Sequence, residues 1–157
     1  MKILLAVDDS PGSEAALRAV LRRASEPAAE VKILHVIQPP SASVRFAVAA
    51  AGQVAGYPAS LTPELEDASK RAQELVGNAA RQLQRAGFKA AGTVEYGDPK
   101  SVIIDAATEW NADLIVVGAH GYRGVERFLM GSVSEAVARH AACSVEIVRL
   151  QKQPTKG

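Results

Sequence analysis

The sequence predicts an α/β fold of the doubly wound class, in which helices cover both faces of a mostly parallel, five-stranded sheet. Five apolar runs have the composition of strands, at residues 3–7, 31–37, 91–96, 114–117 and 145–150. Segments with helical spacing separate these runs, and such alternation implies right-handed crossovers between parallel strands. The first run, Ile-Leu-Leu-Ala-Val, has no polar alternation, which is expected of a strand that is buried on both faces.

The first helix is expected from Pro11 to about Ala24, with Ser10 as its N-cap and Pro11 at the first helical position. The second helix starts at Thr62-Pro63 and ends before Gly87, which stands where a C-terminal glycine belongs. Its apolar residues recur on one face: Leu65, Ala68, Ala72, Leu75, Val76, Ala79 and Leu83.

A third helix is expected from Asp98-Pro99 to about Glu109, and a fourth from Ser132. Together these elements form one domain, residues 1–150, followed by a C-terminal tail, residues 151–157. Residues 38–62 have no convincing periodicity, and a structureless loop of this length is unusual in a compact domain. This region is a mobile connection, a lid over a ligand, or a loop that contains a short helix.

Composition excludes several classes of protein. The net charge of +1 gives no general attraction for nucleic acid or anionic lipid, and aromatic residues make up only 4%. No segment approaches the roughly 20 apolar residues of a membrane span, and the first apolar run is too short for a signal peptide. We therefore expect a cytoplasmic protein. Cys143, the single cysteine, lies in an apolar stretch that favours an unreactive thiol.

The segment from Gly118 to Ser132 leaves a strand through glycines and enters a helix at Gly-Ser. Ser132 and Glu135 fit a capping box. The amides at the start of the helix, and the hydroxyls of Ser132 and Ser134, are suited to hold phosphate oxygens. On the residues alone, phosphate binding and simple helix capping remain equally good interpretations.

Other nucleotide motifs do not match. The segment has no lysine and does not fit the P-loop pattern. The first turn, Asp-Asp-Ser-Pro-Gly, is not a dinucleotide fingerprint. Ligands of open α/β sheets collect at the carboxyl ends of the strands, where Asp8, Val36, Gly97 and Gly118 all fall. The sequence therefore predicts one crevice built from distant segments.

These segments resemble the nucleotide-binding branch of the universal stress protein family. That branch's pattern, Gly-x2-Gly-x9-Gly-Ser/Thr, reads here as Gly118, Gly121, Gly131 and Ser132. The first strand with its Asp-Asp-Ser turn, the Leu-His-Val-Ile of the second strand and the later Gly-Asp-Pro turn also match. The resemblance implies a Rossmann-like, adenine nucleotide alpha hydrolase-like sheet of order 3-2-1-4-5, with the crevice between the first and fourth strands.

The resemblance also implies roles for particular residues. Ala6 and Val36 would lie against adenine, and Asp8 would contact the ribose or help to place Mg²⁺. Gly118 and Gly121 would let the loop close around ribose and phosphates. The full predicted site is Ala6, Val7, Asp8, Val36, Gly118, His120, Gly121, Arg123, Gly131, Ser132, Val133 and Ser134.

No residue is assigned a catalytic role. His120 fits a packing or hydrogen-bonding role in the loop, and Arg123 or Arg127 either pairs with a γ-phosphate or is a solvated charge. His35 and His140 are expected to be structural.

The expected function is that of a regulatory, stress-response protein that binds ATP, with Mg²⁺. A slow ATPase and a ligand-free interaction module are the alternatives. The resemblance also implies a homodimer through the last strand, residues 145–150, although Glu146 interrupts a usually apolar run there and Ser144 replaces a common proline.

Overall fold

The computed structural model describes residues 1–23, 29–39, 61–119 and 130–150. The predicted loop or lid, apart from its ends, and the C-terminal tail lie outside these residues, so both predictions remain untested. In the described part of the chain, no helix is long and apolar enough to cross a membrane.

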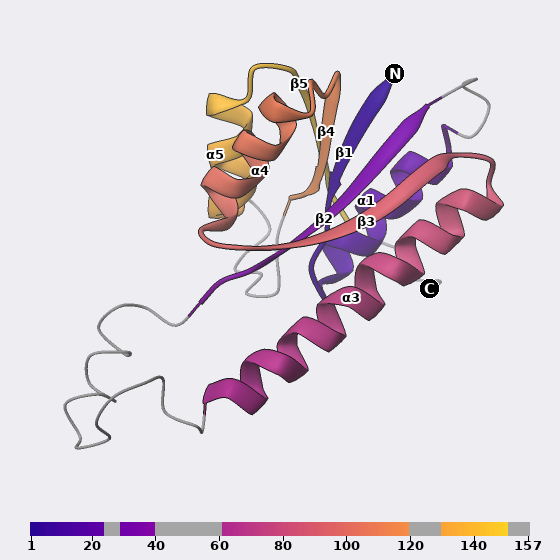
Figure 1. Ribbon diagram of the computed structural model, residues 1–157. Helices are drawn as coiled ribbons and strands as arrows, with labels where there is room; N and C mark the ends of the chain where they lie inside the picture. The colour runs from indigo at the N-terminus through magenta and orange to yellow at the C-terminus, as the bar shows by residue number, and fades with distance from the viewer. Residues whose placement is uncertain (24–28, 40–60, 120–129, 151–157) are drawn as a thin grey trace, which may run out of the picture.

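The sheet is confirmed as parallel and five-stranded, in the order β3-β2-β1-β4-β5. Figure 1 shows β1 at its centre, with β3 and β5 at the two edges. Each expected strand is present, with bounds that differ by one or two residues. The strands are β1 (Lys2–Ala6), β2 (Glu30–Ile37), β3 (Lys89–Tyr96), β4 (Leu114–Gly118) and β5 (Ser144–Val148).

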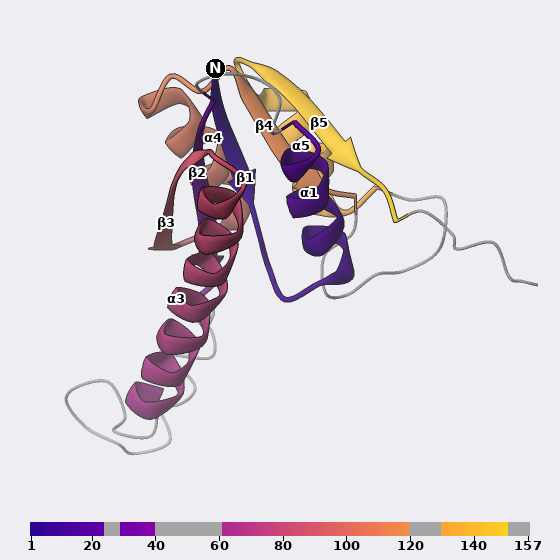
Figure 2. The ribbon, with the colours of Figure 1, turned by 90° about the vertical axis from the view of Figure 1, so that its right-hand side faces the viewer.

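Helices cover both faces of the sheet (Figures 1 and 2). One core packs α1 and α3 against Ile3, Leu5 and Val7 of the central strand segment. The other packs α4 and α5 against Leu4 and Ala6, because successive side chains of a strand point to opposite faces. The helices are α1 (Pro11–Leu21), α3 (Leu61–Arg85), α4 (Pro99–Glu109) and α5 (Ser132–His140).

The predicted helix starts are confirmed for α1 and α4. The Ser10 hydroxyl accepts a hydrogen bond from the amide of Ser13 at 3.2 Å, and Asp98 accepts one from the amide of Ser101 at 3.3 Å. In each helix a proline follows the cap, where its missing N–H costs nothing. Helix α1 ends at Leu21, shorter than the expected end near Ala24.

The end of α3 is also confirmed. Gly87 has φ +95°, and the amide of Phe88 donates to the carbonyl of Leu83 at 3.1 Å, as in a Schellman motif. The start of α3 differs slightly, because the helix begins at Leu61 and so already contains Thr62, the expected cap. Proline is tolerated in a first helical turn, so Pro63 does not prevent this earlier start.

Candidate functional site

The carboxyl edge of the sheet has a switch point between β1 and β4. Both strands are parallel neighbours, but the chain leaves β1 toward α1 on one face and β4 toward α5 on the other. The two connections diverge there, and ligands of open α/β sheets bind at such a point. Of the predicted site residues, the structure brings Ala6, Val7 and Asp8 to this edge beside Gly118.

The start of α5 is tied to the end of β4. The amide of Gly131 donates to the carbonyl oxygen of Ala119 at 2.7 Å. The Ser134 hydroxyl lies 3.1 Å from the same oxygen and 2.8 Å from the carbonyl oxygen of Gly131. Ser134 is only 1% exposed, so its hydroxyl is a buried structural donor. The prediction that this hydroxyl serves a phosphate is therefore not supported, whereas the Ser134 amide remains a candidate.

The capping box predicted at Ser132 and Glu135 is wrong. The N-cap of α5 is Gly131, which has no side chain to cap the helix, and Ser132 is the first helical residue. The amide of Glu135 donates to the Gly131 carbonyl at 2.9 Å and begins the helical hydrogen-bond ladder. The amides of Ser132, Val133 and Ser134 precede that ladder, so the helix itself offers them no acceptor. Within the described residues, the positive end of the helix dipole is thus left available.

Gly118 is required where β4 meets α1. A Cβ built on Gly118 would lie 2.6 Å from the carbonyl carbon of Gly12 and 2.8 Å from its oxygen. Backbone cannot yield as a flexible side chain can, so only glycine fits here. This contact supplies a structural reason for Gly118, independent of the loop closure that the resemblance implies for it.

Asp8 holds the turn between β1 and α1 together. Its Oδ1 accepts hydrogen bonds from the amide of Ser10 at 3.1 Å, from the Ser10 hydroxyl, and from the Ser13 hydroxyl at 2.6 Å. The Ser13 hydroxyl in turn accepts the Asp8 amide at 2.8 Å. Because every bond to the carboxylate goes to Oδ1, Oδ2 has no hydrogen-bond partner in the described part of the chain.

The end of β2 extends beyond β1. The Leu34 carbonyl accepts the amide of Val7 at 2.9 Å, and β1 contributes no further partner. In a parallel strand, residues two apart turn their amide and carbonyl to the same neighbour. The amide and carbonyl of Val36 therefore point toward the space beyond the end of β1. Its side chain packs on the same face of the sheet as Ala6, while Val7 packs on the opposite face.

His35 has the structural role that the sequence predicts. Its Nδ1 lies 2.9 Å from the carbonyl oxygen of Val7, so the ring joins β2 to the residue that follows β1. His140 lies at the end of α5 and is exposed.

A hollow of about 220 Å³ lies beside this edge on the α3 side. Arg71, an exposed residue of α3, also lines this hollow, although its place in the sequence gives no reason to single it out. The hollow is lined by Asp9, His35, Val36, Ile37, Gln38, Ala68, Arg71, Ala72 and Leu75.

Other site predictions remain open. His120, Gly121, Arg123 and Arg127 lie outside the described residues. Within the described residues, no cluster of three or more His, Cys, Asp or Glu side chains could hold a metal ion. A bound Mg²⁺ would therefore need ligands from elsewhere, such as phosphate oxygens, in addition to Asp8.

The structure is a doubly wound α/β domain with a switch point at the carboxyl edge of its sheet. The sequence profile of the universal stress protein family matches residues 1–149. A universal stress protein of Staphylococcus aureus (strain USA300) is 38% identical over 154 residues, which span 97% of this chain and 86% of that protein. The chain therefore belongs to the universal stress protein family.

Solved structures agree with this assignment. The hypothetical protein MJ0577, a test case of structural genomics, superposes with a TM-score of 0.78 at 27% identity, covering 97% of each chain. A universal stress protein in complex with cAMP has a TM-score of 0.65 at 24% identity, covering 94% of this chain and 96% of its own. A family member from Arabidopsis thaliana with AMP bound has a TM-score of 0.64 at 19% identity, covering 99% and 97%. The last two likenesses show the shared fold.

Proposed function

We propose that the crevice between β1, β2 and β4 binds an adenine nucleotide, specifically ATP with Mg²⁺, and that the protein is a regulatory binding protein rather than a fast enzyme. The observation that carries this proposal is the fixed position of the α5 amino terminus. The Gly131 amide and the Ser134 hydroxyl tie it to Ala119, at the switch point of the sheet.

The phosphate chain would bind at the start of α5. The amides of Ser132, Val133 and Ser134 have no acceptor within the helix, and the helix dipole favours negative charge there. Ser132 is exposed, so its hydroxyl is available as a further donor, in contrast to that of Ser134. Residues of the glycine pattern outside the described part, among them Gly121 and Arg123, would complete the phosphate contacts.

Adenine would bind at the end of β2. Its edge carries both a hydrogen-bond donor and an acceptor, which complement the amide and carbonyl that Val36 turns toward the crevice. The side chains of Ala6 and Val36, on one face of the sheet, would supply the apolar contact. Complexes of two family members with cAMP and AMP support the choice of an adenine nucleotide.

Asp8 fits a role beside the ribose or Mg²⁺, because its Oδ2 has no partner in the described chain while Oδ1 holds the turn. When bound, Mg²⁺ would neutralise charge on the phosphates. Rapid hydrolysis requires groups that stabilise the transition state more than the ground state, such as a placed base and additional positive charge on the γ-phosphate. The sequence assigns no such base, so we expect turnover well below about 1 s⁻¹.

Two measurements on the purified protein test this function. The first is the ultraviolet spectrum and mass of any copurifying ligand, followed by calorimetric titration with ATP, ADP, AMP and cAMP, with and without Mg²⁺. The second follows phosphate release from ATP over hours. Saturable binding of ATP with slow release supports the proposal. Absence of binding to any adenine nucleotide would favour a ligand-free interaction module, and release at several per second would show an enzyme.

We also propose that the protein forms a homodimer through β5. This strand is an edge of the sheet, where unpaired backbone groups favour pairing with another strand. Glu146 does not leave an unpaired charge there, because its Oε2 lies 2.6 Å from a guanidinium nitrogen of Arg23 on the α1 side of the sheet. Light scattering at micromolar concentration should give the mass of a dimer, and a monomer mass would refute this part of the proposal.

A further inference from the structure

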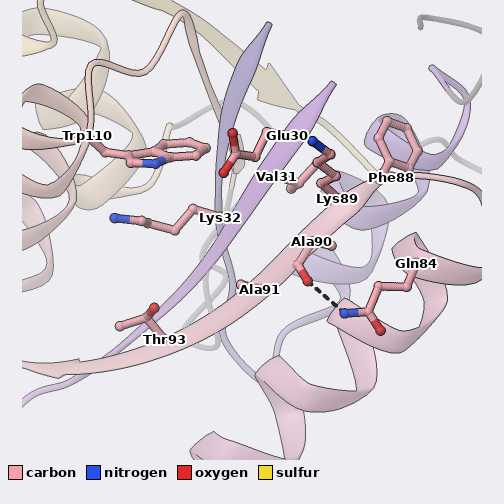
Figure 3. Close-up of a pocket in the computed structure, with 10 residues that line it drawn as sticks. All are labelled: Glu30, Val31, Lys32, Gln84, Phe88, Lys89, Ala90, Ala91, Thr93 and Trp110. Carbon is pink, nitrogen blue, oxygen red and sulfur yellow. Dashed lines mark hydrogen bonds between the residues drawn. The ribbon is translucent and has the colours of Figure 1, made fainter. Parts of the chain in front are cut away.

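A second hollow, of about 350 Å³, lies at the opposite, amino-terminal ends of β2 and β3 (Figure 3). Glu30 and Lys89 are the first residues of these two strands, whereas the nucleotide crevice lies where the strands end. The volume is in the range of small-molecule sites. The hollow is lined by Glu30, Val31, Lys32, Gln84, Phe88, Lys89, Ala90, Ala91, Thr93 and Trp110.

The hollow lies around the edge strand β3: Gln84, Phe88 and Ala90 line it on the α3 side, and on the opposite side part of the sheet face is uncovered. Lys32 pairs in register with Ala91, and both lie on the face that α4 covers farther along the sheet. Trp110, the C-cap of α4, stands beside Lys32, and Figure 3 shows its ring and the Lys32 side chain next to each other. Since Ala91 is small, it does not fill the space at the edge strand.

The charges of the hollow are poorly neutralised. The Lys32 ammonium lies 5.1 Å from the centroid of the Trp110 ring, and that of Lys2 lies 5.4 Å from it. Lys2 also donates to the Trp110 carbonyl at 3.1 Å. In the described part of the chain, neither of these lysines nor Lys89 forms an ion pair. Asp113 is close by, but it accepts the backbone amide of Lys2.

Two further polar groups limit which ligands would fit the hollow. The Glu30 carboxylate makes no hydrogen bond or ion pair in the described chain, and neither does the Thr93 hydroxyl. A simple anion would satisfy the ammonium groups but would be repelled by Glu30. A ligand with hydroxyl groups next to its anionic group would satisfy both, because hydroxyls donate to a carboxylate.

We propose that this hollow binds a small phosphate monoester of a polyol. Lys32 and Lys89 bind the phosphate, Glu30 and Thr93 bind the hydroxyls, and the edge of the Trp110 ring forms an apolar wall. A site of this size and a chain net charge of +1 favour a small molecule over a nucleic-acid strand. The site is separate from the nucleotide crevice and does not depend on the function proposed for it.

Trp110 is the only tryptophan, so its fluorescence reports on this site directly. Glycerol 3-phosphate is the probe, and its two halves, glycerol and inorganic phosphate, are titrated in parallel. We expect a saturable fluorescence change, confirmed by calorimetry, with the ester binding at least about tenfold tighter than either half. No saturable binding at millimolar concentration, or equal binding of ester and phosphate, would overturn the proposal.

Three variants locate the binding. Lys89→Ala should weaken binding of glycerol 3-phosphate about tenfold. Glu30→Gln should weaken binding of the ester but not binding of inorganic phosphate. Lys70→Ala, at an exposed lysine of α3 that does not line the hollow, is the matched control and should bind normally. Saturating ATP should leave the titration unchanged. Competition by ATP, or full binding by Lys89→Ala, would place the probe elsewhere and refute the site.

Discussion

Gly118, the last residue of β4, lies directly against the backbone of Gly12 in the first turn of α1. A Cβ on Gly118 would approach the Gly12 carbonyl carbon to 2.6 Å, well inside normal contact. This contact places the end of β4 against the start of α1, beside the proposed nucleotide crevice. A glycine that belongs to a nucleotide pattern thus also has a role in packing, and the two roles can be separated by experiment.

Gly118→Ala should destabilise the fold by about 1–3 kcal/mol, because the added methyl group forces backbone to move. Urea denaturation measures this change. Gly77→Ala is the matched control, since its Cβ would meet only the flexible end of Arg81 at 3.4 Å. Alanine within a helix should then stabilise the protein by about 0.5–1 kcal/mol. Equal stability of Gly118→Ala and wild type would show that the contact is not rigid.

Gly131→Val should lower ATP affinity at least about tenfold, about 1.4 kcal/mol. The variant should stay folded and lose about 1 kcal/mol of stability, because valine is a poorer N-cap than glycine. Gly131 has φ −62° and ψ 148°, a conformation that valine adopts readily, so backbone strain is not expected. An effect on binding would therefore report the close approach of a ligand. Calorimetry of the folded variant measures the affinity, and unchanged affinity would rule out the proposed phosphate position.

Two variants of Asp8 should separate its effect on the stability of the turn from its effect on cation binding. Asp8→Ala removes the acceptor of the Ser10 and Ser13 hydroxyls and should cost about 1–3 kcal/mol of unfolding free energy. Asp8→Asn retains an oxygen acceptor, so the turn should be largely preserved, but the negative charge is lost. We expect this variant to keep most of its stability and to bind ATP more weakly with Mg²⁺ than the wild type does. If Mg²⁺ raises the ATP affinity of Asp8→Asn as much as it raises that of the wild type, Asp8 has a role in the turn only.

Cys143 should react slowly with alkylating reagents at pH 8. Burial raises the pKa of its thiol, and the nearby Asp113 charge acts in the same direction, so less thiolate is present than in a free cysteine. The thiol is half-buried and packs against the α4–α5 core, as the apolar sequence around it suggests. The pH dependence of iodoacetamide alkylation should show a midpoint above about 8.5, the usual value for cysteine. A midpoint at or below that value would contradict this environment.

The raised pKa of Cys143 also determines how the stability of the fold changes with pH. A raised pKa means that the folded state favours the neutral thiol, so this contribution is fully present below the unfolded-state pKa. It is lost as the pH rises through the folded-state pKa. Unfolding measured on wild type and Cys143→Ser across alkaline pH should show a steeper loss of stability in the wild type.

Local patterns alone determined most of the fold. Runs rich in apolar residues predicted all five strands. The caps Ser10 and Asp98 predicted helix starts because a cap depends only on residues two or three positions away. Gly87 predicted the end of α3 for the same reason. The sheet order came from the family resemblance and is confirmed.

Only the tertiary structure decided which groups are available at the candidate site. The sequence predicted a phosphate contact from the Ser134 hydroxyl and a cap at Ser132. In the structure this hydroxyl lies 3.1 Å from the Ala119 carbonyl oxygen, and Gly131 is the N-cap. Likewise, Gly118 needs to be glycine because Gly12 lies against it, more than a hundred residues away in the chain. Hydrogen-bond partners and steric contacts depend on distances between remote segments, and a local sequence pattern contains no information about those distances.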